Sequence, residues 1–384
     1  MNETVKADKT ACCGCGACFL ACPVGAITLR PDDEGFAYPE IDAEKCIHCD
    51  ICRKVCGFGL PGAGAEKPGH TQAPAVFAAR KAGGGHWQSR SGGAFAALAE
   101  TILAMGGVVY GAALMPGCET VRHVRAAAPA ELAPLRGSKY LQSEAAEAMR
   151  QAAEDLAAGK TVLFSGVACQ IDGLYRLLAQ KHISAHTLYT CDIVCHGVPS
   201  PKVWRDNLAY LTKKYGAAPE TAQFRDKRMG WRAHIESYTV GGKKHFSNRF
   251  TQLYGQGLIT RPACAACSYC RVQHPADLTL SDGWNVKAAA PEWDDNQGVS
   301  CILVQTEKGQ ALLEKCGALL ERKPVPMGYQ GQPNLMRASQ PGAARADFWR
   351  LYREKGYAAA VKRYASSLKE LAKIPYNLLK NPKR

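Results

Sequence analysis

The sequence lacks any long, uninterrupted run of apolar residues. Its most apolar stretch, residues 98–115, is broken by one glutamate and three glycines, which makes it too short and too interrupted to span a bilayer. Residues 1–11 are polar and contain no apolar core of the kind that secretory signals have. We therefore expect a cytoplasmic protein with no transmembrane segment, in a reducing compartment where disulfides are rare.

The common nucleotide-binding motifs are also missing. The sequence has no P-loop, and no G-x-G-x-x-G motif lies between a predicted strand and a predicted helix, so nothing indicates a Rossmann-type nicotinamide site. Two Gly-rich segments remain, at residues 90–95 and 136–140. Backbone amides at the start of a helix, together with a lysine, can bind a diphosphate. A tight turn is the alternative interpretation of both segments.

Acidic residues are scarce relative to basic ones, but only in part of the chain. The 384 residues carry a formal net charge of +14. Residues 1–60 contain 6 Lys and Arg against 9 Asp and Glu, whereas residues 337–384 contain 12 against 3. The basic charge therefore lies mainly in the C-terminal segment, away from the cysteines, and no recognition motif accompanies it. We expect no nucleic-acid partner.

Strand-like and helix-like segments alternate over most of the chain. Residues 108–114, 161–165 and 188–194 resemble buried strands, and residues 143–158 form an Ala/Glu-rich helical pattern. Ser200 and Pro201 suit the N-cap and first position of a further helix running to about residue 214. This alternation predicts an α/β domain with a largely parallel sheet, followed by a basic helical tail with Val361, Tyr364, Leu368 and Leu371 along one stripe.

Cysteine is the one residue type in clear excess, with eighteen copies. The first group is a C-x2-C-x2-C-x3-C-P run, the spacing that bacterial ferredoxins use for 4Fe–4S clusters, and the same spacing recurs about thirty residues later. In such a pair the fourth cysteine of each run binds the cluster of the other run. We therefore expect one cluster on Cys12, Cys15, Cys18 and Cys56, and a second on Cys46, Cys49, Cys52 and Cys22.

A zinc site is the alternative for these runs. Structural zinc usually takes two separated C-x2-C pairs, and two complete four-cysteine runs fit that pattern poorly. Two details depart from the usual ferredoxin pattern: Gly57 stands where a second proline is common, and Cys13 is an additional cysteine that we interpret as a bystander.

A second set of cysteines is dispersed along the chain. Cys169 and Cys195 each follow a predicted strand, and Cys264, Cys267 and Cys270 form a run with two-residue spacers. Ligands at the carboxyl ends of adjacent parallel strands converge, which is where open α/β sheets place their sites. A zinc ribbon or buried free thiols are the alternatives. The remaining cysteines are interpreted as small core residues, at Cys118, Cys191, Cys301 and Cys316.

Several longer motifs occur in a recognisable order: SRSGGAFAALAETILAMGGVVYGAAL, LRGSKYLQS, VLFSGVACQIDGL, CDIVCHGVPSPKVW, FRDKRMGW and RPACAAC…ADLTLSDGW. With them the chain resembles the coenzyme F-420 hydrogenase/dehydrogenase beta subunit family, fused to a two-cluster ferredoxin domain. The resemblance implies an iron–sulfur flavoprotein that binds FAD non-covalently. The implied domains are a ferredoxin domain of α+β class at 1–58, a Gly/Pro-rich linker at 59–74, an α/β flavin and iron–sulfur domain at 75–335 with parts at about 75–155 and 156–335, and the helical tail at 336–384.

The same resemblance implies particular site residues. A third 4Fe–4S cluster is expected on Cys169, Cys195, Cys264 and Cys267, with Cys270 as a reserve ligand. The flavin site is expected to include Ser91, Gly92, Gly93, Ser138, Lys139, Tyr140 and Gly166. Lys139 is a candidate phosphate or flavin-ring contact, against a surface lysine, and His196 a candidate hydrogen-bond donor or proton shuttle, against a core histidine. Asp282 is expected to accept hydrogen bonds and not to act as a base.

The function expected from these features is electron transfer between ferredoxin clusters and a two-electron acceptor or donor through FAD. The partner would be a redox protein or soluble carrier, with coenzyme F-420 among the small-molecule possibilities. The alternative is an electron-transfer subunit that has no substrate site of its own and docks on a catalytic partner, with the basic tail as a docking helix.

Overall fold

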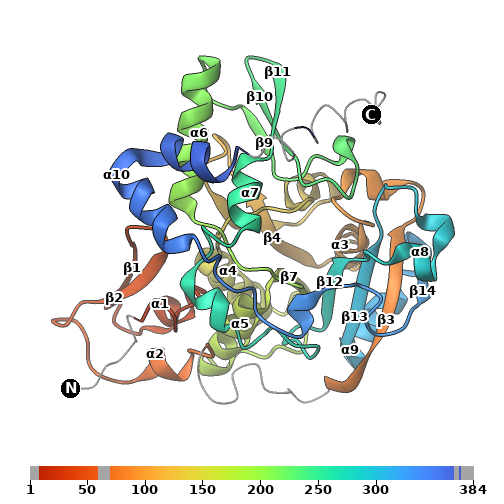
Figure 1. Cartoon of the computed structure of the whole chain (residues 1–384). Helices are drawn as coiled ribbons and strands as arrows, with labels where there is room; N and C mark the ends of the chain where they lie inside the picture. Colours follow the sequence, from red (N-terminus) through yellow and green to blue (C-terminus); the bar gives the residue numbers. More distant parts are fainter. Residues whose placement is uncertain (1–7, 59–69, 367–371, 373–384) are drawn as a thin grey trace.

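The computed structural model describes residues 8–58, 70–366 and 372 of the chain (Figure 1). Its centre is a nine-stranded sheet with the order β14-β3-β13-β12-β8-β7-β4-β5-β6, and two small sheets, β1-β2 and β11-β10-β9, lie outside it. The strands are β1 (Ile27–Pro31), β2 (Ala37–Ile41), β3 (His70–Lys81), β4 (Val108–Leu114), β5 (Val121–Ala126), β6 (Ser143–Glu144), β7 (Val162–Val167), β8 (Leu188–Ile193), β9 (Thr221–Gln223), β10 (Glu236–Val240), β11 (Lys243–Ser247), β12 (Leu278–Asp282), β13 (Ser300–Thr306) and β14 (Leu320–Pro324).

Helices connect and cover these strands. The α-helices are α1 (Ala17–Ala21), α2 (Ile51–Lys54), α3 (Ala94–Ala104), α4 (Ala146–Ala157), α5 (Ala168–Gln180), α6 (Pro201–Tyr215), α7 (Arg249–Gly255), α8 (Val286–Ala289), α9 (Glu307–Lys315) and α10 (Arg345–Tyr364). Short 3-10 helices are η1 (Gly85–Gln88), η2 (Pro129–Leu135), η3 (Lys227–Met229), η4 (Pro262–Ala266), η5 (Pro291–Trp293), η6 (Gly317–Leu319) and η7 (Pro333–Leu335). Among the described residues, no helix combines the length and apolar character needed to cross a bilayer.

The sheet is mixed, and this differs from the largely parallel sheet that the sequence predicts. Its four middle strands, β12, β8, β7 and β4, run parallel to one another. The neighbouring pairs β12–β13, β13–β3, β3–β14 and β4–β5 are antiparallel. The strand β3 lies between β13 and β14, so the two expected parts of the main domain share one sheet. The parallel centre keeps the carboxyl ends of β7, β8 and β12 at one edge.

Apolar side chains on both faces of the sheet form the core. Helices α3 and α9 pack on one face with Leu98, Ile102 and Leu312 buried, whereas α4 and α5 pack on the other with Met149 and Ile171 buried. The predicted cysteines of the core are buried as expected, at Cys118, Cys191, Cys301 and Cys316. Consecutive residues of the middle strands are buried, as expected for a sheet that helices cover on both faces.

The bounds that local sequence signals predict for helices and strands agree closely with the observed ones in several cases. The strand expected at residues 108–114 is observed at that position, and β8 ends one residue before the predicted limit. Ser200 is the N-cap of α6, because its hydroxyl accepts a hydrogen bond from the Val203 amide, and Pro201 is the first helical residue. The helix expected from residue 143 begins later, at Ala146, because Ser143 pairs with Val121 in β6.

The ferredoxin segment lies against α4 and α5 (Figure 1). Its hairpin β1–β2 and helices α1 and α2 form a small unit whose Ala17 and Val55 are buried on α4 and α5. Gly57 explains the departure from the usual ferredoxin pattern, because a Cβ there would collide with the Asp172 carboxylate and the Arg176 guanidinium of α5. A proline does not fit this contact. The glycine therefore belongs to the junction between the two regions.

Two expected boundaries change in the structure. Residues 59–69 of the predicted linker lie outside the described residues, and residues 70–74 belong to β3, which begins before the expected domain start at residue 75. Because β3 begins with polar residues, the sequence pattern gave no sign that a strand starts there.

The tail helix α10 packs on its own domain. It has a kink at Gly356, and its Phe348, Trp349 and Val361 are buried in a cluster with residues of α6 and α7. Of the apolar stripe predicted for a docking helix, Leu368 and Leu371 lie outside the described residues, while Val361 is buried and Tyr364 is half-buried. The described part of the stripe is therefore core, not a free surface.

Candidate iron–sulfur and cofactor site

Four ferredoxin cysteines surround a small pocket at the protein surface, and we call them the outer group: Cys22, Cys46, Cys49 and Cys52. Cys22 ends α1 and Cys52 lies in α2, so the two helices carry the group together. Cys49 is exposed, and the neighbouring Ile47 is 59% exposed. This is the combination of cysteines that the sequence predicts for one cluster, and it faces solvent.

A second set, the inner group, lies deeper: Cys12, Cys15, Cys18 and Cys56. Burial raises the pKa of Cys12, Cys18 and Cys56, and the neighbouring thiols of the same group raise it further. Gly173 of α5 lies beside Cys15, where a Cβ would come within 3.1 Å of the Cys15 Sγ. The structure thus gathers the four cysteines that the crossed ferredoxin pattern predicts.

No group of three or more His, Cys, Asp or Glu side chains within the described ranges is placed to hold a single metal ion. A 4Fe–4S cluster gives each thiolate its own iron, so its four ligands stand around a cubane and do not converge on one atom.

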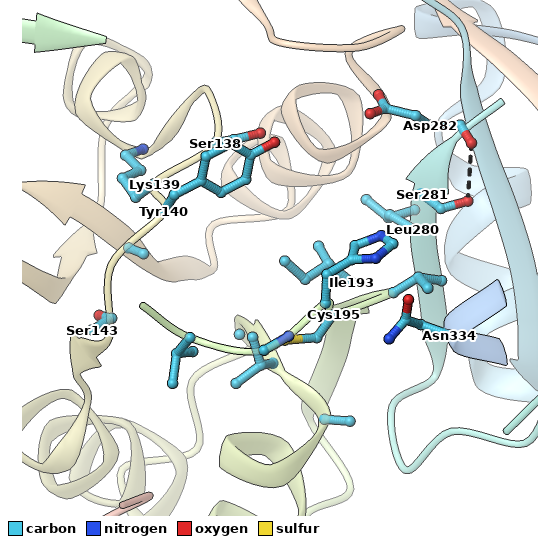
Figure 2. Close-up of a pocket in the computed structure, with 18 of the residues that line it drawn as sticks. Ser138, Lys139, Tyr140, Ser143, Ile193, Cys195, Leu280, Ser281, Asp282 and Asn334 are labelled. Atoms are coloured by element: carbon cyan, nitrogen blue, oxygen red, sulfur yellow. Dashed lines mark hydrogen bonds between the residues drawn. The ribbon is translucent and has the colours of Figure 1, made fainter. Parts of the chain in front are cut away.

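A cavity of about 740 Å³ opens at one edge of the nine-stranded sheet. The carboxyl ends of β7, β8 and β12 line it through Val167, Ile193 and Asp282. Figure 2 shows Ser138, Lys139 and Tyr140 on one side, Ser281, Asp282 and Asn334 on the other, and Cys195 between them. This is the edge at which open α/β sheets place their sites.

The dispersed cysteines all line this cavity, and we call them the third group: Cys169, Cys195, Cys264, Cys267 and the reserve Cys270. Cys169 lies in the first turn of α5 and Cys195 follows β8, so the parallel pairing of β7 and β8 brings them to one edge. Burial raises the pKa of Cys264 to about 11, and it raises that of Cys195 as well. A metal cluster bound here would have to displace these thiol protons.

Cys13, interpreted from the sequence as a bystander, lies close to two of the cysteine groups. Its thiol is within hydrogen-bonding reach of Cys15 in the inner group and of Cys169 in the third group. It also lines the cavity and packs beside Cys169 and Cys267 under Phe58 and Tyr269. The inner and third groups are therefore neighbours, with Cys13 between them.

The first Gly-rich segment only partly faces the cavity. Ser91 and Gly93 line it, and Gly93 is the left-handed N-cap of α3. Gly92 does not line it, because it packs between β3 and β13, where a Cβ would press on Ala79 O and Ser300 N. Gly92 is therefore a close-packing residue of the sheet, and its place in the flavin site stays a prediction. Ala94 and Phe95, at the start of α3, also line the cavity.

The second Gly-rich segment lines the cavity with Ser138, Lys139 and Tyr140. The Lys139 Nζ donates to Pro134 O at 2.7 Å and to Arg136 O at 2.8 Å, and no carboxylate of the described residues pairs with it. Burial lowers the pKa of Lys139 to about 7. A half-buried ammonium held only by carbonyls is suited to an anionic ligand, since the ligand would supply the missing countercharge.

Two further predicted residues, His196 and Gly166, also line the cavity. The His196 Nε2 lies 3.1 Å from Gln332 Oε1, and burial lowers the pKa of this imidazole below its usual range. A neutral imidazole can donate from one nitrogen and accept at the other, so His196 is equipped to move a proton.

The arginines of the far wall were missed by sequence reasoning. The Asp282 carboxylate accepts from Arg225 Nη1 at 2.8 Å and from Trp231 Nε1 at 3.0 Å, as a hydrogen-bond acceptor should. Burial opposes its ionisation, but Arg225 and Arg90 outweigh burial and hold the pKa of Asp282 at about 2. Arg90 is buried, donates only to backbone carbonyls, and its Nε has no partner. The motif FRDKRMGW contains Arg225, and this motif was the sequence signal that could have pointed to the arginine.

The buried pair His274–Asp192 was also missed. The His274 Nδ1 lies 3.0 Å from Asp192 Oδ2, and His274 lines the cavity near Cys267. The spacing of these two residues, 82 positions apart, gives no local signal of their contact.

Comparison with known proteins identifies both regions of the chain. Residues 11–60 match the model of the 4Fe-4S dicluster domain, and residues 159–325 match the model for the C terminus of the coenzyme F-420 hydrogenase/dehydrogenase beta subunit. An uncharacterized ferredoxin of Methanocaldococcus jannaschii is 37% identical over 56 residues, which are 15% of this chain and 71% of that ferredoxin.

Among solved structures, a chain from the xenon derivatization of the F-420-reducing NiFe hydrogenase complex of Methanosarcina barkeri aligns with a TM-score of 0.49 and 16% identity, over 77% of this chain and 93% of that chain. The two family matches agree with the resemblance seen in the motifs. Through residues 159–325 the chain belongs to the coenzyme F-420 hydrogenase/dehydrogenase beta subunit family, and through residues 11–60 it is a two-cluster ferredoxin, which together make it an iron–sulfur electron-transfer protein of an oxidoreductase family.

Proposed function

We propose that the chain is an iron–sulfur flavoprotein oxidoreductase that moves electrons between its surface and a two-electron acceptor or donor in the cavity. In this proposal a third 4Fe–4S cluster is held by Cys169, Cys195, Cys264 and Cys267, with Cys270 in reserve, and FAD binds in the cavity beside it. The observation that carries the proposal is a continuous series of cysteine groups from the surface to the cavity.

This series has no large gap between its members. The outer and inner groups share α1, which has Cys18 within it and Cys22 at its end. The inner and third groups meet at Cys13, whose thiol lies beside both Cys15 and Cys169. The third group lines the cavity directly. Each cysteine group thus has a neighbour to which an electron can pass.

The cavity wall fits FAD in its charge distribution. Lys139 and Arg90 are cations that pair with no carboxylate among the described residues, and the start of α3 faces the same cavity. A helix start with a nearby cation can bind a diphosphate, and Arg90 lies four residues before α3. Ser91, Gly93, Ser138, Tyr140 and Gly166 would complete the wall around the cofactor. FAD bound there would supply the exchange between one-electron and two-electron chemistry.

Two side chains are proposed to act on the reacting groups. His196 would donate a hydrogen bond or move a proton at its ring nitrogen, because it lines the cavity and follows Cys195 directly. Lys139 would hold the cofactor's phosphate or ring oxygen. The substrate class is a small two-electron acceptor or donor, with coenzyme F-420 one candidate.

A redox protein is the proposed partner at the outer group. Cys49 is exposed there, and the apolar side chains Ile47, Val24 and Phe19 are 59%, 41% and 40% exposed. Such a patch at an exposed cluster suits transient docking of another electron carrier.

Anaerobic purification followed by assays for iron, acid-labile sulfide, zinc and flavin tests the proposal. The expected result is about twelve irons per chain, four for each of three clusters, with about one FAD. About eight irons without flavin would overturn the enzyme assignment and leave a ferredoxin fused to a domain of another function. Steady reduction of a soluble acceptor by the isolated chain would exclude the alternative of a subunit without its own substrate site.

A further inference from the structure

Arg261 is a buried arginine at the junction of the ferredoxin segment and the cavity domain. It is 1% exposed and lies just before η4, the turn that carries Cys264. Its guanidinium reaches across to the ferredoxin segment, donating to Cys12 O at 2.7 Å and to Ala37 O at 2.9 Å. The Nη2 also lies 3.6 Å from the Cys12 Sγ.

Within residues 8–58 and 70–366, no carboxylate pairs with this guanidinium. Among the described residues, its remaining polar contact is the neutral Gln142 Oε1 at 2.8 Å, and its flat faces lie near the rings of Tyr38 and Phe36 at 4.3 and 5.4 Å. The other cation beside the inner group, Arg176, is paired with Asp172 at 2.8 Å. A buried charge is costly unless a countercharge meets it.

The inner group supplies that countercharge when its four cysteines bind a cluster as thiolates. The guanidinium is always charged and holds a fixed position, so it stabilises negative charge at Cys12. A reduced cluster carries one more negative charge than an oxidised one. Net charge and hydrogen bonds to the sulfurs are among the factors that set the reduction potential of such clusters.

We propose that Arg261 is a positioning residue that raises the reduction potential of the cluster on Cys12, Cys15, Cys18 and Cys56 relative to that of the outer cluster. This rests on the proposed function. Next to the outer group, in contrast, Arg53 is 59% exposed, so loss of Arg261 should change the midpoint of the inner cluster and leave that of the outer cluster in place. The same side chain ties the turn of the third group to the inner group.

The sequence around Cys12 is adapted to this contact. Gly14 has a φ of +71°, and a Cβ at this position would come within 2.6 Å of Arg261 Nη1 and 2.5 Å of Gln142 Nε2. Gln142 Nε2 also donates to Cys13 O at 3.1 Å, which fixes the amide and keeps its oxygen facing Arg261. The short spacer between the first cysteines thus leaves room for the guanidinium.

An EPR-monitored redox titration of the full chain, purified anaerobically, tests the inference. In Arg261→Gln we expect one ferredoxin midpoint to fall, with the one-electron equilibrium constant changing about tenfold, or ~59 mV. The other ferredoxin midpoint stays in place. Arg261→Lys keeps the charge and should shift the midpoint less. The matched control is Arg53→Gln, which removes an exposed arginine beside the outer group and should move neither midpoint measurably.

A second variant keeps the arginine and guards against misfolding of the first. Gln142→Glu has almost the same shape, places a carboxylate on Arg261 and gives up the Nε2 donation to Cys13 O, so the added negative charge should make the same midpoint fall in the same direction. Unchanged midpoints in both variants, with clusters present, would overturn the inference, and so would equal shifts of both ferredoxin midpoints. Absence of ferredoxin or third-group clusters from the wild-type chain would instead count against the proposed function, so the two failures are distinguishable.

Discussion

The ferredoxin segment and the cavity domain both gather cysteines, but they do so on different scales. The outer group comes from a segment of about thirty residues and faces solvent at Cys49. The third group comes from separate segments of the chain, from Cys169 to Cys270. The parallel strands, α5 and η4 hold these segments in place. A site of the first kind is fixed by local spacing, whereas a site of the second kind depends on the whole sheet.

The largest expected effect is loss of one cluster. Cys195→Ser removes a thiol of the third group, so the iron content should fall from about twelve to about eight per chain, while the ferredoxin EPR signals persist. Cys316→Ser is the control, because Cys316 is buried in the core, 3.4 Å from the Thr101 hydroxyl, and contacts no cysteine group. Retention of all iron in Cys195→Ser would show that the new serine oxygen, Cys270 or another residue serves as the ligand in its place.

The next effect concerns the bond between the two regions. Glu34 of the ferredoxin segment pairs with Arg345 of α10, with Nη1–Oε1 at 3.0 Å, and burial raises the pKa of Glu34 in spite of this arginine. The pair therefore matters chiefly because each partner spares the other from being a lone buried charge. We expect Glu34→Ala to lower the free energy of unfolding by about 2–3 kcal/mol, measured by anaerobic denaturant titration.

Glu40→Ala is the matched control on the same hairpin. Glu40 pairs with Arg30, and the two side chains are 62% and 70% exposed. This pair should contribute less than about 1 kcal/mol to the free energy of unfolding. Equal losses in the two variants would show that the junction adds nothing to the stability of the ferredoxin segment.

A smaller effect is expected in the cavity. Lys139→Gln removes a cation that no carboxylate neutralises, so the affinity for FAD should fall about tenfold to a hundredfold, since one charged hydrogen bond is lost. Flavin retention after gel filtration and fluorescence titration measure the change. Lys213→Gln, on the exposed end of α6, should leave the affinity unchanged. The iron content of both variants should match the wild type.

The smallest effect is a pH dependence of the same contact. Burial lowers the pKa of Lys139 to about 7, so above this pH the free protein loses the charge that an anion needs. The affinity for FAD should therefore be highest below about pH 7 and fall between pH 7 and 9. Burial also lowers the pKa of Lys227 to about 7, but Lys227 is not among the residues that line the cavity. In Lys139→Gln the pH profile should become flat if Lys139 is responsible.

The sequence was informative wherever a signal was local. The spacing of the ferredoxin cysteines anticipated how they divide between the outer and inner groups, and Ser200–Pro201 gave the start of α6. Cys169 and Cys195 were predicted to converge because each follows a strand, and both line the cavity. Residues whose role comes from tertiary packing gave no such signal: Gly92 belongs to the contact of two strands, and Arg261 reaches a segment 249 positions away. The position of Cys13 beside Cys169 also had no local signal, because the two residues are distant in the chain.

The glycine after Cys56 has a kinetic consequence. Because Gly57 seats the ferredoxin segment on α5, the inner group meets the third group within one molecule and needs no diffusional encounter. Electron exchange between these two regions should therefore be first order, with a rate constant that dilution of the protein leaves unchanged. If the ferredoxin were a separate protein, the rate at which it delivers electrons to the same cavity would fall in proportion to its concentration. Only the electron exchange at the outer group, where another carrier must arrive from solution, should have a rate that depends on concentration.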